Sequence, residues 1–237
     1  MKKIVVLSGA GMSADSGINT FRDSGGLWEG HDVMEVASPE GFRRNPDLVL
    51  DFYNQRRRQL FEVDPNAGHR ILASLESHFE VQIITQNVDD LHERAGSSQV
   101  LHLHGELLKA RSTGPNQRVY PWKTDLGPGD SCEEGYPLRP DIVWFGEAVP
   151  LLGTAAEWVM DAEILIVVGT SLQVYPAAGL LGYKQPGVPL YLIDPNPSLR
   201  AGDIDMLHIL PERAATGLPI LANQLIDTWR GSDSPNP

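Results

Sequence analysis

Hydrophobic and polar positions alternate along this chain in blocks that predict an open parallel sheet. Five short apolar runs, rich in β-branched residues, are typical of buried strands; they cover residues 4–7, 81–85, 100–104, 164–168 and 190–194. A sixth strand is expected over 141–147. Helix formers and helical spacing predict helices over 42–63, 65–79, 154–161 and 222–229. Strands and helices that alternate in this way predict an α/β fold, with a Rossmann-type parallel sheet and helices on both faces.

Composition narrows the classes of function. The chain has 237 residues, of which 41% are hydrophobic, so we expect a folded globular protein with one large core or two lobes. A formal net charge of −12 argues against general binding of nucleic acid or of anionic membranes. The first apolar run is too short for a secretory signal, and no stretch approaches a membrane span, so a soluble cytoplasmic protein is expected. Residues 231–237 are expected to be a disordered tail.

The first predicted strand leads directly into a glycine-rich turn. Gly9 and Gly11, followed by the small Ala14, fit the strand–turn–helix pattern that binds dinucleotides. In that pattern the glycines allow the backbone to approach a pyrophosphate, and the helix N-terminus offers free N–H groups. Taken alone this motif is weak, because an ordinary tight turn between a strand and a helix explains it equally well.

Polar residues also follow three other predicted strands. Ligands bind outside the carboxyl ends of the strands in an open parallel sheet, so these positions are candidates for a site. They are Gln86, Asn87 and Asp89 after the second strand, His102 and His104 around the third, and Gly169, Thr170 and Ser171 after the run 164–168. An Asn- and Asp-rich turn that caps a helix is the alternative explanation of 87–90.

Together these motifs resemble the sirtuins, the NAD-dependent protein-lysine deacylases. The resemblance rests on five segments in the family's order, which are 9–22, 85–92, 104–105, 169–171 with Val174, and Asn196. It covers about residues 3 to 230 and implies a protein of two lobes. The Rossmann lobe that carries NAD would comprise 1–24, 68–108 and 141–230. A helical insertion, 25–67, and a loop-rich module, 109–140, would form the small lobe, with the peptide and NAD meeting between the lobes.

The resemblance also implies the reaction, in which an acyl group passes from lysine to ADP-ribose while NAD is consumed as co-substrate and nicotinamide is released. His104 would be the general base, because a neutral imidazole that titrates near pH 7 suits this work. His102 shares a strand face with His104, so spacing does not choose between them, but Gly105 and the family motif favour His104. Asn87 and Asp89 would hold the nicotinamide, and Gln86 would reach a ribose.

The remaining roles come from the same resemblance. Hydroxyl and backbone groups that would hold NAD are contributed by Gly9, Ala10, Gly11, Ser13, Ala14, Gly169, Thr170 and Ser171. Phe21 would shield the reactive carbon, Arg22 would orient the ligand and Asn196 would contact the adenosine ribose. The backbone of Val143 to Glu147, including Phe145 and Gly146, would pair with the substrate peptide as an extra strand.

Tyr53 and Arg56 point to a particular acyl group. They lie three residues apart on a predicted helix and therefore share a face. A phenol and a guanidinium together suit a carboxylate, and the spacing resembles the Tyr-x-x-Arg of the sirtuin branch that removes succinyl and malonyl groups. The small Ala14 would leave room for such a group. The alternative is that Arg56, Arg57 and Arg58 form a solvated basic face and that Tyr53 only packs.

The chain departs from the family in the module that normally binds zinc. Sirtuins place two cysteine pairs there, whereas this chain has the single cysteine Cys132, with Ser112 earlier in the segment. One thiolate with such neighbours does not hold Zn²⁺, so we predict no zinc and no other metal. The apolar residues left to pack the module are Tyr120, Trp122, Tyr136 and Leu138.

Three other functions remain open at this point. A nicotinamide dehydrogenase would produce reduced cofactor, whereas a sirtuin releases free nicotinamide. A degenerate NAD-binding or scaffold protein would explain the missing cysteines, and an ADP-ribosyltransferase would use the same site with another nucleophile. For the sirtuin interpretation the expected partners are proteins that carry acylated lysines, with no nucleic acid and no membrane, and the protein is expected to be a monomer.

Overall fold

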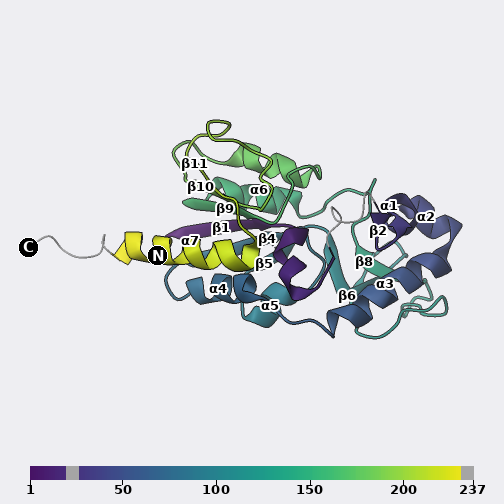
Figure 1. The fold of residues 1–237 in the computed structure, drawn as a ribbon. Coiled ribbons are helices and arrows are strands. Elements are labelled where there is room, and N and C mark those ends of the chain that lie inside the picture. The colour runs from purple at the N-terminus through teal and green to yellow at the C-terminus, as the bar shows by residue number, and fades with distance from the viewer. Residues whose placement is uncertain (20–26, 231–237) are drawn as a thin grey trace, which may run out of the picture.

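A six-stranded parallel sheet forms the centre of the larger lobe (Figure 1). The computed structural model describes residues 1–19 and 27–230. The strand order is β11-β10-β9-β1-β4-β5, and every neighbouring pair is parallel. Its strands are β1 (Lys3–Ser8), β4 (Glu80–Thr85), β5 (Val100–His102), β9 (Ile164–Val168), β10 (Leu190–Ile193) and β11 (Leu207–Leu210). The predicted α/β fold with a Rossmann-type sheet is therefore confirmed.

Helices cover both faces of this sheet. Successive residues of β1 point to opposite sides and pack against different helices. Ile4 and Val6 face α4 (Ala67–Leu75) and α7 (Ala214–Arg230), and Val5 and Leu7 face α6 (Leu152–Met160) and the 3₁₀ helix η4 (Ala177–Tyr183). A strand that is buried on both faces is apolar at most positions, which is why the sequence of these strands is nearly continuously hydrophobic. Figure 1 shows α4 and α7 on one side of β1 and α6 on the other.

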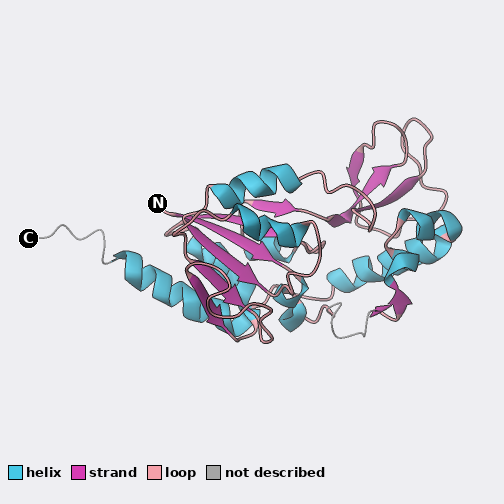
Figure 2. Ribbon diagram, turned by 90° about the horizontal axis from the view of Figure 1, so that it is seen from above, coloured by secondary structure: helices cyan, strands magenta, loops and turns pink. Residues whose placement is uncertain are grey.

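The smaller lobe combines helices with a separate antiparallel sheet (Figure 2). Its helices are α1 (Val33–Val36), α2 (Pro39–Arg44) and α3 (Pro46–Leu60), preceded by the two-residue strands β2 (Leu27–Trp28) and β3 (His31–Asp32). The sheet has the order β7-β6-β8, from β6 (Gly105–Ser112), β7 (Val119–Pro121) and β8 (Leu138–Ile142). A core that includes Phe52, Tyr53, Leu107 and Trp144 joins α3 to this sheet.

The expected strands 4–7, 81–85, 100–104, 164–168 and 190–194 correspond to β1, β4, β5, β9 and β10. The expected helices correspond to α2 with α3, α4, α6 and α7, and α7 begins eight residues before the predicted start at 222. Local propensity missed this early start because Gly217 and Pro219 are poor helix formers. Packing of Leu218 and Leu221 against the sheet supports the first turns instead.

One sequence prediction about this architecture is wrong. The strand expected over 141–147 ends at Ile142, in β8 of the small sheet, and the residues that follow form a turn. The small sheet also extends past both ends of the expected module 109–140, because Gly105 pairs with Ile142. These residues belong to the small sheet by backbone pairing, although they lie within the expected Rossmann segments 68–108 and 141–230.

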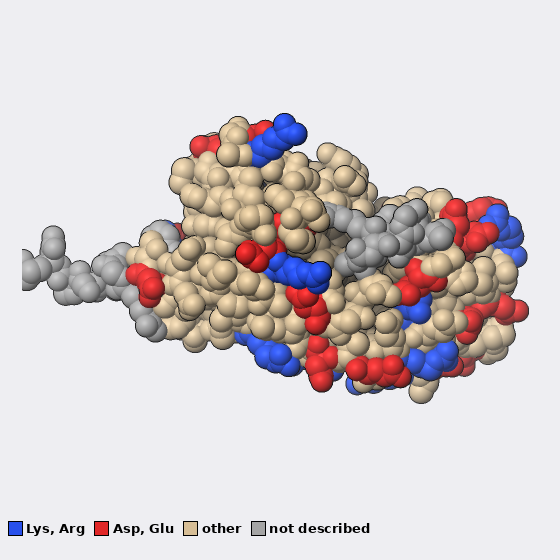
Figure 3. Space-filling model, viewed as in Figure 1, with Lys and Arg blue, Asp and Glu red and all other residues tan. Residues whose placement is uncertain are grey.

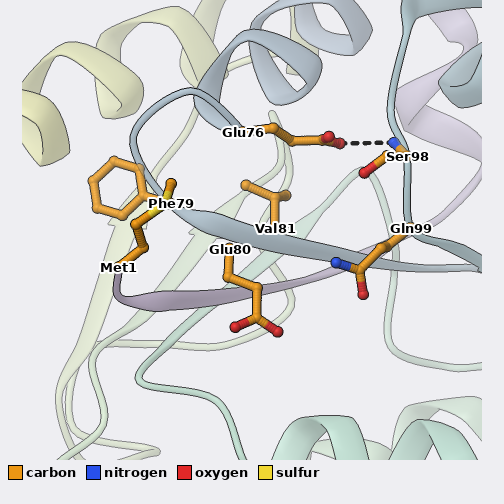
Figure 4. A pocket seen from close by; sticks show the side chains of 7 residues that line it. All are labelled: Met1, Glu76, Phe79, Glu80, Val81, Ser98 and Gln99. Carbon is orange, nitrogen blue, oxygen red and sulfur yellow. Dashed lines mark hydrogen bonds between the residues drawn. The ribbon is translucent and has the colours of Figure 1, made fainter.

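Charges of both signs are interspersed over the face of the molecule seen in Figure 3. Within the described part of the chain, no helix combines the length and the apolar character needed to cross a bilayer. One pocket of about 350 Å³ lies at the amino ends of β1 and β4, where Glu76 accepts a hydrogen bond from the Ser98 amide (Figure 4). Parallel sheets bind ligands at the opposite, carboxyl end, so this pocket is not our candidate for the active site.

Candidate active site

The polar residues predicted from the sequence meet at the carboxyl ends of the central strands. β1 lies between β4 and β9, so the loops that follow these three strands start side by side. The chain leaves β1 for β4 on one side and reaches β9 on the other, which makes this edge a topological switch point. The loops carry Gly9 to Ser13, Gln86 to Asp89, and Gly169 to Ser171.

The glycine-rich turn packs against the loop after β9. Gly9 N–H donates to the carbonyl of Val168 and Gly11 N–H to that of Gly169. A Cβ on Gly9 would lie 2.7 Å from Cβ of Thr170, and one on Gly11 would lie 2.7 Å from Cα of Gly169. The two glycines therefore permit close contact between two protein loops.

This geometry corrects two expectations for the turn. The Gly11 amide was expected to bind phosphate, but it already donates to Gly169. The expected helix after the turn is replaced by two 3₁₀ turns, η1 (Ala10–Met12) and η2 (Ala14–Ser16). Such short turns do not supply the dipole of a full helix, so this part of the prediction was wrong.

Ser13 links two of the predicted catalytic residues. Its hydroxyl accepts a hydrogen bond of 3.0 Å from Nδ2 of Asn87 and donates one of 2.9 Å to Oδ2 of Asp89. All three side chains are buried. Ser13 was expected to bind phosphate through its side chain, but both hydrogen-bonding roles seen here serve the Asn87–Asp89 loop.

Asp89 also caps the helix that follows, which was the alternative explanation of residues 87–90. Oδ1 of Asp89 accepts from the amide of Leu91, the first residue of α5 (Leu91–Ala95). Asp90 is the N-cap by position but makes no capping hydrogen bond, and its carboxylate lies 3.7 Å from Arg94. Burial raises the pKa of Asp89, while the hydrogen bond from Ser13 opposes this shift.

The structure distinguishes the two candidate histidines. Nδ1 of His104 lies 3.0 Å from the carbonyl oxygen of Gln86, so this nitrogen carries the proton and Nε2 keeps its lone pair. Burial lowers the pKa of His104, which favours this neutral form. His102 has acceptors at both nitrogens, the carbonyl of Asn87 at 3.1 Å and Glu93 Oε1 at 2.7 Å. A general base needs a free lone pair, and only His104 offers one.

Gly105 follows the base for a steric reason. Its φ of +82° lies in the left-handed region that glycine tolerates best. A Cβ at this position would collide with the carbonyl oxygen of Asp141 in β8. The His-Gly pair thus marks the place where the chain leaves the large sheet and enters the small one.

The outer parts of the predicted NAD site lie at the ends of β4, β9 and β10. Nε2 of Gln86 donates to Oγ1 of Thr170 across the sheet edge, at 3.1 Å. Ser171 is half-buried beside them. Asn196 is exposed, and its backbone N–H donates to Oδ1 of the buried Asp194. Phe21 and Arg22, which were expected to shield and orient the ligand, lie outside the described residues.

Tyr53 and Arg56 occupy different environments on α3. Tyr53 is fully buried, and its hydroxyl accepts a hydrogen bond of 3.0 Å from Nε1 of Trp144. Burial raises the pKa of Tyr53, so the phenol stays protonated and still has its own hydrogen to donate. Arg56 is half-buried with its guanidinium over the ring of Phe52 at 5.0 Å, and its Nε has no hydrogen-bond partner.

The neighbouring arginines of α3 do not form a solvated basic face. Arg57 is 1% exposed and donates to the carbonyl of Leu107 and to Oδ1 of Asn54. Burial lowers its pKa to about 10. Arg58 forms an ion pair with Asp125 at 2.5 Å. Of the three, Arg56 alone is without a hydrogen bond or ion pair to another described residue.

The segment expected to bind peptide is a braced turn. The backbone amide of Val143 donates to the carbonyl of His104, and the backbone amide of Phe145 donates to the carbonyl of Ala37. Glu147 forms a bidentate ion pair with Arg139, and its carboxylate accepts a hydrogen bond from the backbone amide of Trp144. Burial opposes the charge of Glu147, but Arg139 outweighs it and lowers the pKa. Phe145 and Gly146 remain exposed.

The loop-rich module does not present a zinc site. The hydroxyl of Ser112 donates to Sγ of Cys132 at 3.3 Å and accepts from the Gly114 amide. Among the residues that the structure describes, no three His, Cys, Asp or Glu side chains gather as metal ligands. One thiolate beside a hydroxyl does not fit the four-ligand site of a structural zinc, so we assign no step to a metal.

Comparison with known proteins identifies this arrangement. The model of the Sir2 family matches residues 9–176, which include the turn, the Asn87–Asp89 loop and His104. The chain belongs to the Sir2 family. It is 64% identical over 195 residues to an NAD-dependent protein deacylase of Helicobacter pylori, covering 82% of this chain and 85% of the relative. Over 232 residues it is 53% identical to an NAD-dependent protein deacylase of Bacteroides thetaiotaomicron, covering 95% and 99% of the two chains.

A solved structure shares the fold of this Sir2 protein. The complex of a Sir2 homologue with NAD superposes with a TM-score of 0.86 at 38% identity, covering 96% of this chain and 90% of the homologue. The donor set here fits a dinucleotide, because amide, hydroxyl and imidazole groups gather at one sheet edge. Gln86, Asn87, Thr170 and Ser171 are the side chains that would hold it.

Sequence reasoning missed two partners in this Sir2 site. Glu93 contacts His102 from the first turn of α5, and Trp144 contacts Tyr53 from a distance of 91 residues along the chain. Glu93 follows Asp89 by four residues, but its position in the sequence does not predict a contact with His102, which lies at the end of β5. No local pattern pairs Trp144 with Tyr53.

Proposed function

We propose that this protein removes acyl groups from lysine side chains by transfer to the ADP-ribose of NAD, with His104 as the general base. Its class, an NAD-dependent protein deacylase, is that of its close Sir2-family relatives. The observation that carries the proposal is the hydrogen bond from His104 Nδ1 to the Gln86 carbonyl. This bond fixes the tautomer that leaves Nε2 free to accept a proton from a ribose hydroxyl.

The Ser13–Asn87–Asp89 network would bind and orient the nicotinamide end of NAD. Asn87 has an amide oxygen, and Asp89 is held by Ser13 and by the Leu91 amide, so the loop enters the reaction with its geometry already set. NAD itself supplies the ADP-ribose acceptor and nicotinamide as the leaving group. Gln86, Thr170, Ser171 and Asn196, together with Phe21 and Arg22, are the proposed contacts to the rest of the dinucleotide.

We further propose that acyl groups with a terminal carboxylate, succinyl and malonyl, are accepted along with acetyl. Tyr53 keeps a hydroxyl hydrogen, because its oxygen is the acceptor in the bond from Trp144. Arg56 carries a half-buried guanidinium over Phe52. A carboxylate between these two groups would receive a neutral and a charged hydrogen bond. Ala14 is half-buried and small, which suits a longer acyl chain.

The peptide backbone is proposed to bind along Val143, Phe145, Gly146 and Glu147. Exposed Phe145 and Gly146 lie beside Val143, whose amide is bonded to the residue of the base itself. Backbone recognition fits substrates of varied sequence, namely proteins with acylated lysines. The net charge of −12 argues against binding of nucleic acid or anionic membranes. We further propose that the protein is a cytoplasmic monomer.

Mass spectrometry of acetyl-, succinyl- and malonyl-lysine peptides, incubated with and without NAD, tests the proposal. We expect peptide masses to fall by one acyl group only with NAD, and free nicotinamide to appear. His104→Ala should abolish both changes, whereas His78→Ala, at an exposed position, should not. A peptide mass that rises by ADP-ribose would indicate ADP-ribosyl transfer, and reduced cofactor would indicate a dehydrogenase. Deacylation that survives in His104→Ala would refute the assigned base.

A further inference from the structure

His102 makes two hydrogen bonds that a neutral imidazole does not satisfy. Its Nδ1 lies 3.1 Å from the carbonyl oxygen of Asn87, and its Nε2 lies 2.7 Å from Oε1 of Glu93. A carbonyl and a carboxylate only accept, so both ring nitrogens must carry hydrogen. The side chain is 7% exposed, so water has little access to it as a substitute partner.

We propose that His102, held protonated by Glu93, is a positioning residue that clamps the backbone of Asn87 and so sets the nicotinamide-binding loop. This inference rests on the proposed function, because it assigns its effect to the Asn87–Asp89 loop. The backbone carbonyl of Asn87 and its side chain belong to one residue, and that side chain donates to Ser13, which donates to Asp89. Displacement of the Asn87 backbone would therefore move all three groups.

Two histidines thus hold two consecutive carbonyls of the same loop. His104 donates to the Gln86 carbonyl and His102 donates to the next one, that of Asn87. The first must be neutral to act as a base, and the second must be charged to keep both of its partners. The loop geometry and the free base therefore coexist only over a limited range of pH.

Ionisable groups from three directions face His102. Burial opposes its charge, but Glu93 on α5 and Glu106 on β6 outweigh burial and raise its pKa. Asp89 lies close enough for His102 to lower the pKa of its carboxyl, and the buried His92 is held neutral with its pKa lowered chiefly by burial. Glu106 is itself paired with Lys109 at 2.5 Å, so Glu93 is the direct partner.

The pH profile of kcat/KM for NAD tests this role. Wild-type activity should rise as His104 loses its proton below the ordinary histidine pKa of about 6.5 and fall as His102 loses its proton above it. Glu93→Gln should move the falling limb toward lower pH and leave the rising limb in place. His102→Gln should remove the falling limb and reduce kcat/KM for NAD by about tenfold to a hundredfold, with KM for the acylated peptide unchanged.

Glu106→Gln is the matched control, because it removes a nearby charge without removing a hydrogen bond to His102. The falling limb of the pH profile should move less in Glu106→Gln than in Glu93→Gln. A purely structural role would scale activity equally at every pH and would leave both limbs where they are. That result, or a falling limb that persists in His102→Gln, would overturn the inference alone. Failure of the wild-type protein to release nicotinamide from NAD and acyl-peptide would overturn the proposed function and this inference with it.

Discussion

Nε1 of Trp144 donates a hydrogen bond of 3.0 Å to the hydroxyl of Tyr53, and both side chains are buried. The bond occupies the acceptor side of the phenol, so the hydrogen of Tyr53 must point in another direction. Trp144, which lies in the turn proposed to bind peptide, also packs its ring against the guanidinium of Arg139 on β8, at 3.6 Å from the ring centroid. One tryptophan therefore connects the peptide-binding turn with the residue proposed to select the acyl group.

Trp144→Phe should lower the preference for carboxylate-bearing acyl groups. The substitution keeps an aromatic ring for Arg139 but removes the N–H that orients Tyr53. We expect the ratio of desuccinylation to deacetylation, each measured as kcat/KM, to fall roughly fivefold, the size of one neutral hydrogen bond. Trp158→Phe on α6 is the control and should leave the ratio unchanged. If Trp144→Phe lowers both activities in proportion, Trp144 does not contribute to the preference between succinyl and acetyl groups.

The double substitution Tyr53→Phe with Arg56→Met removes both proposed donors to an acyl carboxylate. Desuccinylation should fall by about a hundredfold and deacetylation by less than tenfold, because acetyl has no charge to pair with Arg56. Steady-state kinetics on matched succinyl- and acetyl-lysine peptides measures this difference. Arg58→Met is the control, since Arg58 pairs with Asp125 on the surface. Equal loss of both activities would sink the carboxylate-binding hypothesis.

The module without zinc should be insensitive to chelators and dependent on Asn54. The side chain of Asn54 accepts from the amide of Leu126 at 2.8 Å and donates to its carbonyl at 3.0 Å, which ties the module to α3. Asn54→Ala should therefore cost about 2 kcal/mol and lower Tm by about 4–8 °C.

The control for this prediction lies in the module itself. Asn116 bonds Glu134 on the surface, so Asn116→Ala should change Tm little. Prolonged treatment with a strong chelator should change neither Tm nor deacylase activity of the wild-type protein. Unfolding or loss of activity after chelation would contradict the prediction that the chain binds no zinc.

Acid should destabilise the protein through a buried histidine on α4. His69 is fully buried, and its pKa is lowered to about 4 chiefly by burial. The unfolded chain binds this proton near pH 6.5, so the folded state loses stability as the pH falls from about 6.5 to about 4, by up to about 3 kcal/mol. The free energy of unfolding by urea, measured as a function of pH, should show this slope.

His69→Gln should reduce that slope, and the buried His92, whose pKa burial also lowers, should account for part of what remains. His69 Nδ1 accepts from the Asn66 amide at the start of α4, and glutamine at this position preserves such a capping box without titrating. His78→Gln is the control at an exposed position and should leave the slope unchanged. An identical acid slope in wild type and His69→Gln would show that other groups govern acid stability.

Much of the larger lobe could be predicted from the sequence because its signals are local. Apolar runs such as 164–168 are long enough to mark a strand, and each polar group that follows one is carried to the same sheet edge by the parallel topology. The residues after Ile142 form no strand although their composition predicts one. Val143, Trp144 and Phe145 have strand-like composition, yet contacts with His104, Tyr53 and Ala37 hold them in a turn.

The sequence by itself determined the fold class from short-range pattern, and the family from the resemblance of its motifs. It also pointed to many of the described polar residues that meet at this sheet edge. Only the tertiary structure decided between His102 and His104, placed Ser13 between Asn87 and Asp89, and separated Arg56 from the buried Arg57. The physical reason is that a side chain's proton, charge and partners depend on groups brought near it by folding. For His102 the decisive group is Glu93, on a helix that no spacing rule connects to its strand.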